Sequence, residues 1–365
     1  VTMPPSYEGY SLIPEATSAM SAISYDPISD KIVCAYRGAN SYPCIVTADY
    51  SSGSFVWGTP RVIKSQQVQS FCKKLFVGTD GMIHGIFATS TFSYYFRYSI
   101  DGETLNQEVE PVYAFDPSAS TISDGVYNSF TNTTTWVSAH DNSPYGVVVS
   151  TFDASGNATK QSVPNFYDNK PSRSKVAIGY DELNNKYLIS NVNSVVVGTP
   201  AGNSLSFSPV IPLRYGYGDG EFCYDPQSQF MLYAGSSANS TDSWPDDPIS
   251  NTLFAMVCKI SPDGQSVTFS GPNNIHEVED CIPFLSYDSS SKQIVVAFDD
   301  VRAPTRLNRY MGLNIAADGS AIEIVEELGD LTGTSLKSVC LFQSDGRLAY
   351  TDNEKKVKIK TTAIN

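Results

Sequence analysis

Acidic side chains are the most abundant ionisable groups in this 365-residue sequence, which has 38 Asp and Glu residues but only 24 Lys and Arg residues. Glycoside hydrolysis needs two carboxylates that face each other across a cleft. The candidates for such a pair are Asp219, Glu221, Asp280, Asp299 and Asp300. A chain this acidic places some carboxylates near any cleft, so a polysaccharide-cleaving hydrolase is an alternative function here and not the expected one.

Other catalytic and metal-binding patterns are missing from the sequence. No two of the three histidines, His84, His140 and His276, have the spacing of metal ligands, and no GxSxG nucleophile motif is present. The pairs Asp246-Asp247 and Asp299-Asp300 can hold Ca²⁺ together with backbone carbonyls, but no DxDxDG loop accompanies them. We therefore predict no catalytic residue and no cofactor, with Ca²⁺ as the one candidate ion.

The seven cysteines are sparse and odd in number, and no CxxC is present, which argues against a zinc site or a disulfide scaffold. Cys34 and Cys44 flank a short loop, so they form either a cross-strand disulfide or two buried thiols. Sequons occur at Asn132, Asn157 and Asn239, but a chain rich in Ser and Thr produces such triplets by chance.

The net charge of −14 and the pI near 4.6 limit the classes of partner. Such a surface repels phosphate backbones and anionic lipid, so nucleic acid is not an expected partner. No window of 18 apolar residues exists, and membrane insertion is not expected either. Cations, basic proteins and neutral glycans remain as partner classes.

One pattern recurs along the chain: an apolar strand, a short polar turn and a second apolar strand. Its clearest copies cover residues 23–33, 178–189, 222–230 and 285–298. The positions aligned with Tyr25 are Val77, Phe130, Tyr180, Tyr224, Tyr287 and Phe342. Their mean spacing of about 53 residues fits four strands and four connections per unit, which is close to the period of β-propeller repeats.

A second hairpin follows the first in each unit, with Gly- and Asn-containing turns such as 101–103, 201–203 and 317–319. We predict an all-β, seven-bladed propeller of four-stranded antiparallel blades. The predicted blades are 17–64, 65–116, 117–168, 169–213, 214–275, 276–330, and 331–365 with 1–16. The last unit lacks its outer strand, and residues 10–14 resemble that strand, so the N-terminal strand is predicted to close the last blade.

This topology places the turns of each blade on two faces. The short-turn face carries the first and third turns of each blade, and the long-loop face carries the second turns and the links between blades. Binding residues concentrate on variable loops, and Trp and Tyr offer flat apolar surface with one polar group. The predicted ligand-binding residues therefore lie in the long loops: Tyr42, Tyr95, Tyr145, Tyr217, Asp219, Trp244, Asp300, Arg302 and Arg306.

The repeat segments Tyr25–Tyr36 and Ser54–Pro60, echoed by Tyr287–Phe298 and Val197–Pro200, resemble repeats in virion and tail-fibre proteins of marine bacteriophages. The resemblance implies a surface module of a virus particle, extracellular or on the virion. Its implied partners are host glycan or other virion proteins, with oligomeric assembly plausible, and it supplies no catalytic residues. The expected function is a non-enzymatic binding or assembly module, with the hydrolase and a purely structural scaffold protein as alternatives.

Overall fold

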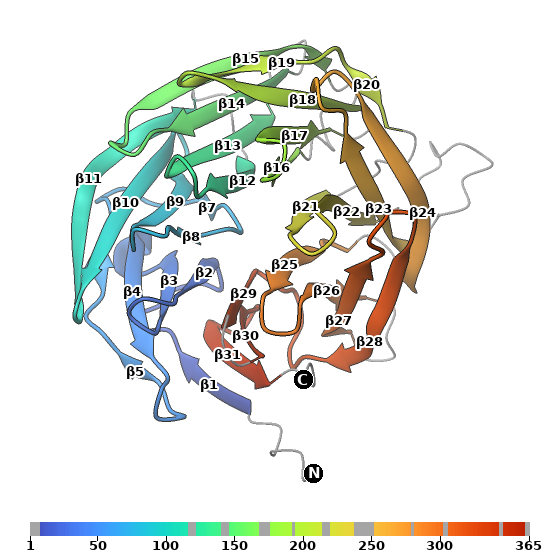
Figure 1. Ribbon diagram of the computed structural model, residues 1–365. Helices are drawn as coiled ribbons and strands as arrows, with labels where there is room; N and C mark the ends of the chain where they lie inside the picture. Colours follow the sequence, from blue (N-terminus) through green and yellow to red (C-terminus); the bar gives the residue numbers. More distant parts are fainter. Residues whose placement is uncertain are drawn as a thin grey trace.

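The computed structural model consists of seven antiparallel sheets arranged in a ring (Figure 1). It describes residues 8–115, 122–139, 146–167, 176–191, 194–213, 220–236, 252–278, 281–301, 306–342 and 346–361. The predicted seven-bladed propeller is confirmed. In these ranges, the one helical segment is the short 3-10 turn η1 (Ala39–Ser41), and no helix is long and apolar enough to cross a bilayer.

Each blade begins at the centre of the ring. The innermost strands are β2 (Ser21–Asp26), β7 (Ser70–Phe71) with β8 (Phe76–Val77), β12 (Ile122–Asn128), β16 (Ala177–Asp181), β21 (Gly220–Asp225), β25 (Phe284–Asp288) and β29 (Ser338–Phe342). The second strands are β3 (Lys31–Arg37), β9 (Ile83–Ala88), β13 (Thr133–Ala139), β17 (Lys186–Ser190), β22 (Phe230–Ser236), β26 (Gln293–Asp300) and β30 (Arg347–Thr351).

The outer half of each blade completes the sheet. The third strands are β4 (Pro43–Asp49), β10 (Ser93–Asp101), β14 (Gly146–Phe152), β18 (Ser194–Ala201), β23 (Thr252–Ile260), β27 (Leu307–Ile315) and β31 (Lys356–Thr361). The outermost strands are β5 (Val56–Trp57) with β6 (Arg61–Val62), β11 (Thr104–Phe115), β15 (Ala158–Tyr167), β19 (Ser204–Phe207) with β20 (Ile211–Pro212), β24 (Val267–Glu277), β28 (Ile322–Asp330) and β1 (Glu8–Leu12). Pro60 and Pro209, which cannot donate a ladder hydrogen bond, lie where two outer strands break.

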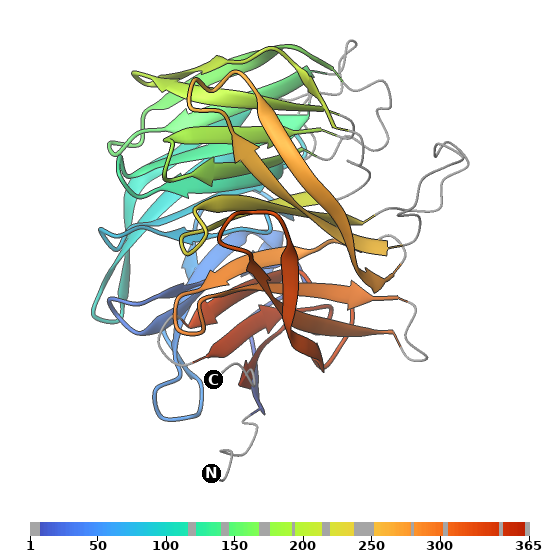
Figure 2. The same ribbon diagram turned by 45° about the vertical axis from the view of Figure 1, so that its right-hand side comes forward.

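The hydrophobic core is divided among the seven blade interfaces, as the stacked blades in Figure 2 illustrate. The described residues form seven buried clusters, and each joins side chains of two neighbouring blades. Successive residues of a strand point to opposite faces of the sheet. Leu188 therefore packs on the fifth blade, while Ile189 packs on the third. Gly179 has no room for a side chain, because a Cβ there would lie 2.4 Å from Cβ of Phe222 in the next blade.

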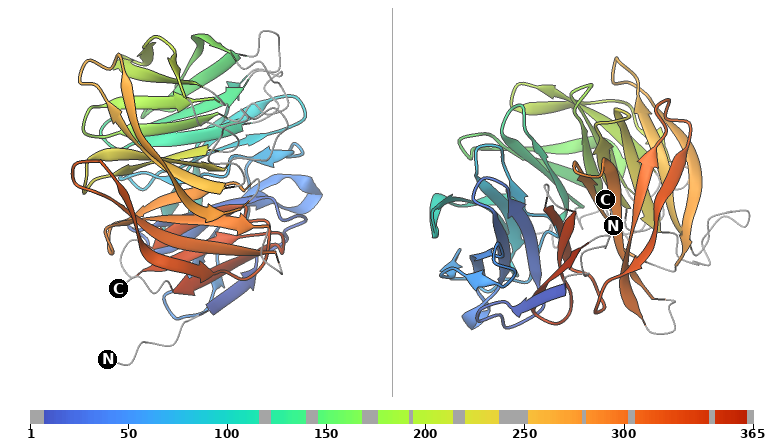
Figure 3. Two further views of the ribbon diagram at one scale, coloured as in Figure 1. Left: turned by 90° about the vertical axis from the view of Figure 1, so that its right-hand side faces the viewer. Right: turned by 60° about the horizontal axis from the view of Figure 1, so that its bottom comes forward.

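The N-terminal strand closes the ring, as predicted. β1 pairs antiparallel with β31, with Gly9 opposite Ile359 and Ser11 opposite Val357. In Figure 3 the blue first strand lies beside the red strands of the last blade. The indole Nε1 of Trp57 in the first blade donates to Ser11 Oγ at 2.8 Å, which also ties β1 to the neighbouring blade.

The Tyr-Asp signature of the repeat has a structural cause at the end of the innermost strand. Asp26 is buried, and its carboxylate accepts the backbone N–H groups of Ile28 at 3.0 Å and Ser29 at 3.3 Å. Asp225 and Asp288 accept turn N–H groups in the same way, at 2.9 Å each. These are Asx turns, which fix the direction of the hairpin.

Two of the predicted repeat positions are wrong in register. Phe130 is exposed in the turn, and Tyr127 occupies the position equivalent to Tyr25. Phe342 pairs with Arg347 as Asp26 pairs with Lys31, so Leu341 is the true counterpart of Tyr25. The third and seventh blades lack a Tyr-Asp dipeptide at this point, which is why the pattern slipped there.

Candidate functional site

A central channel of about 470 Å³ is lined by the innermost strands of all seven blades. Its lining runs from the first residues of these strands, such as Glu221 and Phe284, to residues of the turns that follow them, Pro27, Thr79 and Glu182. The turn residues are exposed, whereas Glu221 and Phe284 are buried. The channel is therefore deepest near the long-loop face and opens on the short-turn face. Its volume is in the usual range for a small-ligand pocket.

Four charged side chains lie across the deep end of the channel, and we call them the floor cluster: Lys73, Lys74, Asp124 and Glu221. Both lysines come from the segment between β7 and β8, where the innermost strand of the second blade is interrupted. Lys73 Nζ lies 2.6 Å from Glu221 Oε2 in the fifth blade. Lys74 Nζ lies 2.9 Å from Asp124 Oδ1 in the third blade and 3.4 Å from Glu221 Oε1. The cluster thus bridges blades on different sides of the channel.

The charges of the floor cluster compensate each other. Burial alone would lower the pKa of the Lys74 ammonium, but Asp124 and Glu221 outweigh burial and raise it. Burial alone would raise the pKa of the Glu221 carboxyl, but Lys73 and Lys74 outweigh burial and lower it. The two basic and the two acidic side chains of the cluster thus pair with each other, as charged groups in a buried cluster require.

The carboxylates of the floor cluster also join adjacent blades. Ile178 N–H of the fourth blade donates to Asp124 Oδ2 at 3.0 Å, and the backbone N–H of Leu285 in the sixth blade donates to Glu221. Ser338 Oγ of the seventh blade accepts Ile23 N–H at 3.0 Å. Asp124, Glu221 and Ser338 occupy one repeat position, three residues before the residue aligned with Tyr25. At three of the seven blade interfaces, this position therefore supplies an acceptor for the next blade.

The open end of the channel is surrounded by tyrosines, which we call the tyrosine collar: Tyr25, Tyr127, Tyr180, Tyr224 and Tyr287. Each belongs to the end of an innermost strand. The Tyr127 hydroxyl accepts Thr79 N–H of the second blade at 3.2 Å. The collar therefore ties blades together, while its rings remain part of the channel wall.

Negative charge collects at the collar on the side of the fourth to sixth blades. Burial is the first cause that raises the pKa of Tyr224 to about 12, and the Asp181 and Glu182 carboxylates are the next. Burial and then Tyr187, Glu182 and Asp181 raise the pKa of Tyr180 to about 12. The hydroxyls of these tyrosines thus experience the field of the acidic turns.

The predicted residues Tyr42, Asp300 and Arg306 lie on the long-loop side of their blades. Tyr42 is half-buried and follows η1 in the loop between β3 and β4. Asp300 is buried at the end of β26, where His276 Nε2 lies 2.9 Å and Arg309 Nε 3.3 Å from its Oδ2. Arg306 is exposed and binds the Asp299 carboxylate through Nε and Nη2.

These contacts limit the chemistry considered for Asp299 and Asp300. As successive strand residues, the two side chains point to opposite faces of the sheet. Each is bound by a different cationic group, so they do not form a joint Ca²⁺ site or a free catalytic pair. Among the described residues, no three His, Cys, Asp or Glu side chains come together as metal ligands.

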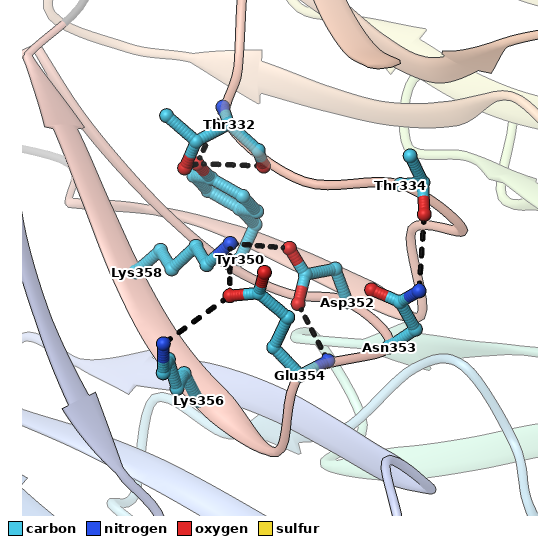
Figure 4. A network of polar contacts seen from close by, with 8 residues as sticks. All are labelled: Thr332, Thr334, Tyr350, Asp352, Asn353, Glu354, Lys356 and Lys358. Atoms are coloured by element: carbon cyan, nitrogen blue, oxygen red, sulfur yellow. Dashed lines mark hydrogen bonds and ion pairs between the residues drawn. The ribbon is translucent and has the colours of Figure 1, made fainter. Parts of the chain in front are cut away.

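A further network on the long-loop side joins the sixth and seventh blades (Figure 4). Lys358 Nζ lies 2.7 Å from buried Asp352 Oδ2 and 2.9 Å from Glu354 Oε2. The Tyr350 hydroxyl accepts Thr332 N–H at 3.0 Å from the link that precedes β29. The drawn charges are paired within the protein, so this network is structural.

The prediction that Tyr95 is a loop residue in the ligand-binding set is wrong. Tyr95 lies within β10 and is fully buried, with its ring stacked 4.0 Å from that of Phe152. Its hydroxyl lies 2.7 Å from His84 Nδ1. Tyr95 belongs to an aromatic stretch of β10 whose bulky residues fill the interfaces of the second blade with the first and the third.

Five of the predicted residues lie outside the described residues: Tyr145, Tyr217, Asp219, Trp244 and Arg302. Asp280 and the Asp246-Asp247 pair also lie outside them. The cross-strand disulfide is not formed, because Cys34 and Cys44 are both free and buried. Cys44 pairs with Tyr36, and Cys34 pairs with Val46, so the two cysteines are not opposite each other.

Of the floor cluster, only Glu221 was among the candidates predicted from the sequence, and the role of the collar was not predicted. The tyrosine that recurs in the repeat could have predicted the collar, because equivalent residues of a closed ring of blades lie around its centre. The signal for the floor was Lys73-Lys74, a lysine pair at the point where an apolar innermost strand is expected.

Comparisons with known proteins support the fold and go no further. No protein-family model and no curated protein matches the chain. Among solved structures, the crystal structure of the Cps50 (Swd1) β-propeller domain of Myceliophteria thermophila matches with a TM-score of 0.58. That match covers 97% of this chain and 100% of the other at 10% sequence identity, so it shows a shared β-propeller fold alone.

Proposed function

We propose that this protein is a non-enzymatic binding module that takes part of its ligand into the central channel from the short-turn face. The observation that carries the proposal is the channel itself, a cavity of about 470 Å³ with an aromatic collar at its open end. Tyrosine side chains supply flat apolar surface and lose little conformational entropy on binding. The rigid ring of blades holds them in place before the ligand binds.

The environment of Glu221 argues against the hydrolase alternative. A glycosidase acid needs a carboxyl whose pKa is raised so that it carries a proton near neutral pH. Lys73 and Lys74 instead lower the pKa of the Glu221 carboxyl. Asp299 and Asp300 are bound by Arg306 and by His276 with Arg309. None of these three carboxylates is free to act as acid or nucleophile.

The resemblance to marine bacteriophage repeats supports a place for the module on a virion surface or in another extracellular setting. In that setting the ligand is a host glycan or a partner protein. The acidic surface disfavours nucleic acid as ligand. A purely structural scaffold is the second candidate, favoured by the extensive contacts that tie the blades together.

A binding and turnover screen with matched variants tests the proposal. The purified protein is screened against a glycan panel and candidate partner proteins, with product release followed in parallel. Ser24→Trp and Ser286→Trp place an indole in the channel, because both serines line it. Tyr42→Ala serves as the control on the long-loop face.

We expect the two channel variants to lose binding and Tyr42→Ala to retain it, with no product released. Loss of binding only in Tyr42→Ala would move the site to the long-loop face. Product release would establish the hydrolase instead. Circular dichroism confirms that each variant is folded.

A further inference from the structure

One part of the collar carries negative charge without a compensating cation. Around Tyr180, Tyr224 and Tyr287, the innermost strands end in buried Asp181, Asp225 and Asp288. Burial, then Asp225 and Asp288, raises the pKa of Tyr287, as Asp181 and Glu182 do for Tyr224. Four carboxylates from three adjacent blades therefore act on the collar tyrosines.

Glu182 is the acid that faces the channel directly. It is exposed in the turn between β16 and β17, and it lines the channel beside Tyr180 and Tyr224. In the described part of the chain its carboxylate has no hydrogen-bond donor and no ion-pair partner. Partial burial of the carboxyl group, and then the nearby Asp181, raise the pKa of Glu182. The ionised carboxylate is therefore destabilised, and a ligand cation would stabilise it.

No basic side chain of the described protein reaches this region. Lys73 and Lys74 are the basic residues that line the channel, and both are paired in the floor cluster. Lys186, next to the same turn, extends away from the channel. Its Cε lies against Gly264 of the next blade, 2.9 Å from where a Cβ on that glycine would be.

The aromatic rings of the collar also favour a cationic ligand. A cation placed over the face of a tyrosine is attracted by the ring quadrupole, and the attraction is stronger where water is excluded. A neutral sugar could stack on the rings and donate hydroxyl hydrogen bonds to the Glu182 carboxylate, but it would leave the negative charge of this region uncompensated. The combination of aromatic rings and unpaired carboxylate therefore favours a cationic group.

We propose that the collar between the fourth and sixth blades binds an ammonium or guanidinium group, presented by a lysine or arginine side chain of a partner protein. The group would lie against the rings of Tyr180 and Tyr224, close to the Glu182 carboxylate, with the rest of the side chain in the channel mouth. This inference rests on the proposed function, because it names the ligand class of the same channel. The net charge of −14 would also attract a basic partner from a distance.

The test uses peptide pairs that differ only in charge. Flexible peptides with one central arginine are compared with the same peptides carrying citrulline, and lysine peptides with their Nε-acetyl-lysine counterparts. Binding to the full chain is measured by isothermal titration calorimetry at low salt. Free spermidine forms a separate arm, which distinguishes a small polyamine from a protein side chain as the source of the cation.

We expect each charged peptide to bind at least about tenfold more tightly than its neutral counterpart. Glu182→Gln should weaken that binding about threefold, and Glu182→Lys at least about tenfold. Glu103→Gln is the matched control, because Glu103 is exposed in a turn of the same face outside the channel. It should leave the affinity unchanged, since it removes the same charge elsewhere.

The outcomes separate this inference from the proposed function. Equal affinity for arginine and citrulline peptides, or equal effects of the Glu182 and Glu103 variants, would overturn the cation site. Binding of a neutral glycan that Ser24→Trp abolishes would then still support the channel as the binding site. Tighter binding of spermidine than of every peptide would overturn the assignment to a protein side chain.

Discussion

The two ends of the central channel are formed by the innermost strands of the same seven blades. They differ in whether their charged groups are paired within the protein. At the deep end, Lys73 and Lys74 neutralise Asp124 and Glu221, and these groups are largely buried. At the open end, Glu182 has no partner in the described chain, and buried aspartates add to its field. The charges of the deep end are compensated within the protein, whereas a cationic ligand would compensate those of the open end.

This difference follows from where each residue lies along its strand. A residue three positions before the collar faces the start of the next blade, so a polar side chain there seals a blade interface, as Asp124 does through Ile178 N–H. A residue at or just after the collar faces the turns and solvent. Early strand positions therefore determine the stability of the ring, and late positions are available for binding.

The largest expected effect comes from breaking the floor cluster. Lys74→Met removes the ammonium that Asp124 and Glu221 share and leaves a buried carboxylate undercompensated. Removing one member of a buried ion pair costs about 3 to 5 kcal/mol. Urea unfolding should show a loss of this size, while Lys160→Met, at an exposed strand position, should change the free energy of unfolding by less than about 0.5 kcal/mol. Equal effects of the two substitutions would contradict the structural role of the floor.

A second effect, driven by pH, arises beside the open end. His84 is buried, and the centroid of its ring lies 5.7 Å from that of Tyr127 of the collar in a tilted arrangement. Burial, opposed by Asp80 and helped by Arg97, lowers its pKa from 6.5 to about 4. Between these pH values the unfolded chain binds a proton that the folded chain does not, so folding stability falls as the pH decreases from 6.5 to 4.

The shift corresponds to about 3 kcal/mol in full. Urea unfolding at a series of pH values should show this loss in the native protein and a smaller slope in His84→Phe, whose ring does not titrate. Parallel slopes in both proteins would show that other groups cause the acid sensitivity.

A smaller effect is expected within the collar itself. The Tyr180 hydroxyl donates to Asn185 Oδ1 at 2.9 Å, where Asn185 holds a positive φ of 51° at the end of the turn. Tyr180→Phe removes this bond but keeps the ring, so it should cost about 1 kcal/mol of unfolding free energy. If the ring is what contacts the cation, affinity for the arginine peptide should remain. A large loss of affinity would instead assign the recognition to the hydroxyl.

The fold could be predicted because its signals are local. The turn after each innermost strand is fixed by an Asp such as Asp26 or Asp225, and its sequence repeats with the blades. Where Asn128 replaces that Asp, the predicted register is wrong by three residues, and near Phe342, where no Tyr-Asp pair exists, it is wrong by one. The prediction of four-stranded blades was nevertheless correct, because the alternation of apolar residues on which it depends is intact around these points.

The channel could not be predicted in the same way, because its wall joins residues that are far apart in sequence. Lys74 and Glu221 are in contact although two whole blades, the third and the fourth, separate them in the sequence. Loop length and aromatic content favour the long-loop face as a prediction, but the same criterion also selected Tyr95, which is buried in β10. A run of aromatic residues fits a blade interface as well as a binding loop, and burial alone decides between them.

The smallest expected effect on stability gives the sharpest comparison between the two ends. Glu182→Lys reverses a charge that has no partner in the described chain, on an exposed turn residue. It should change the free energy of unfolding by less than about 0.5 kcal/mol, against several kcal/mol for Lys74→Met at the floor. A large loss of stability would show that Glu182 holds the ring together, and its unpaired carboxylate would then no longer point to a ligand.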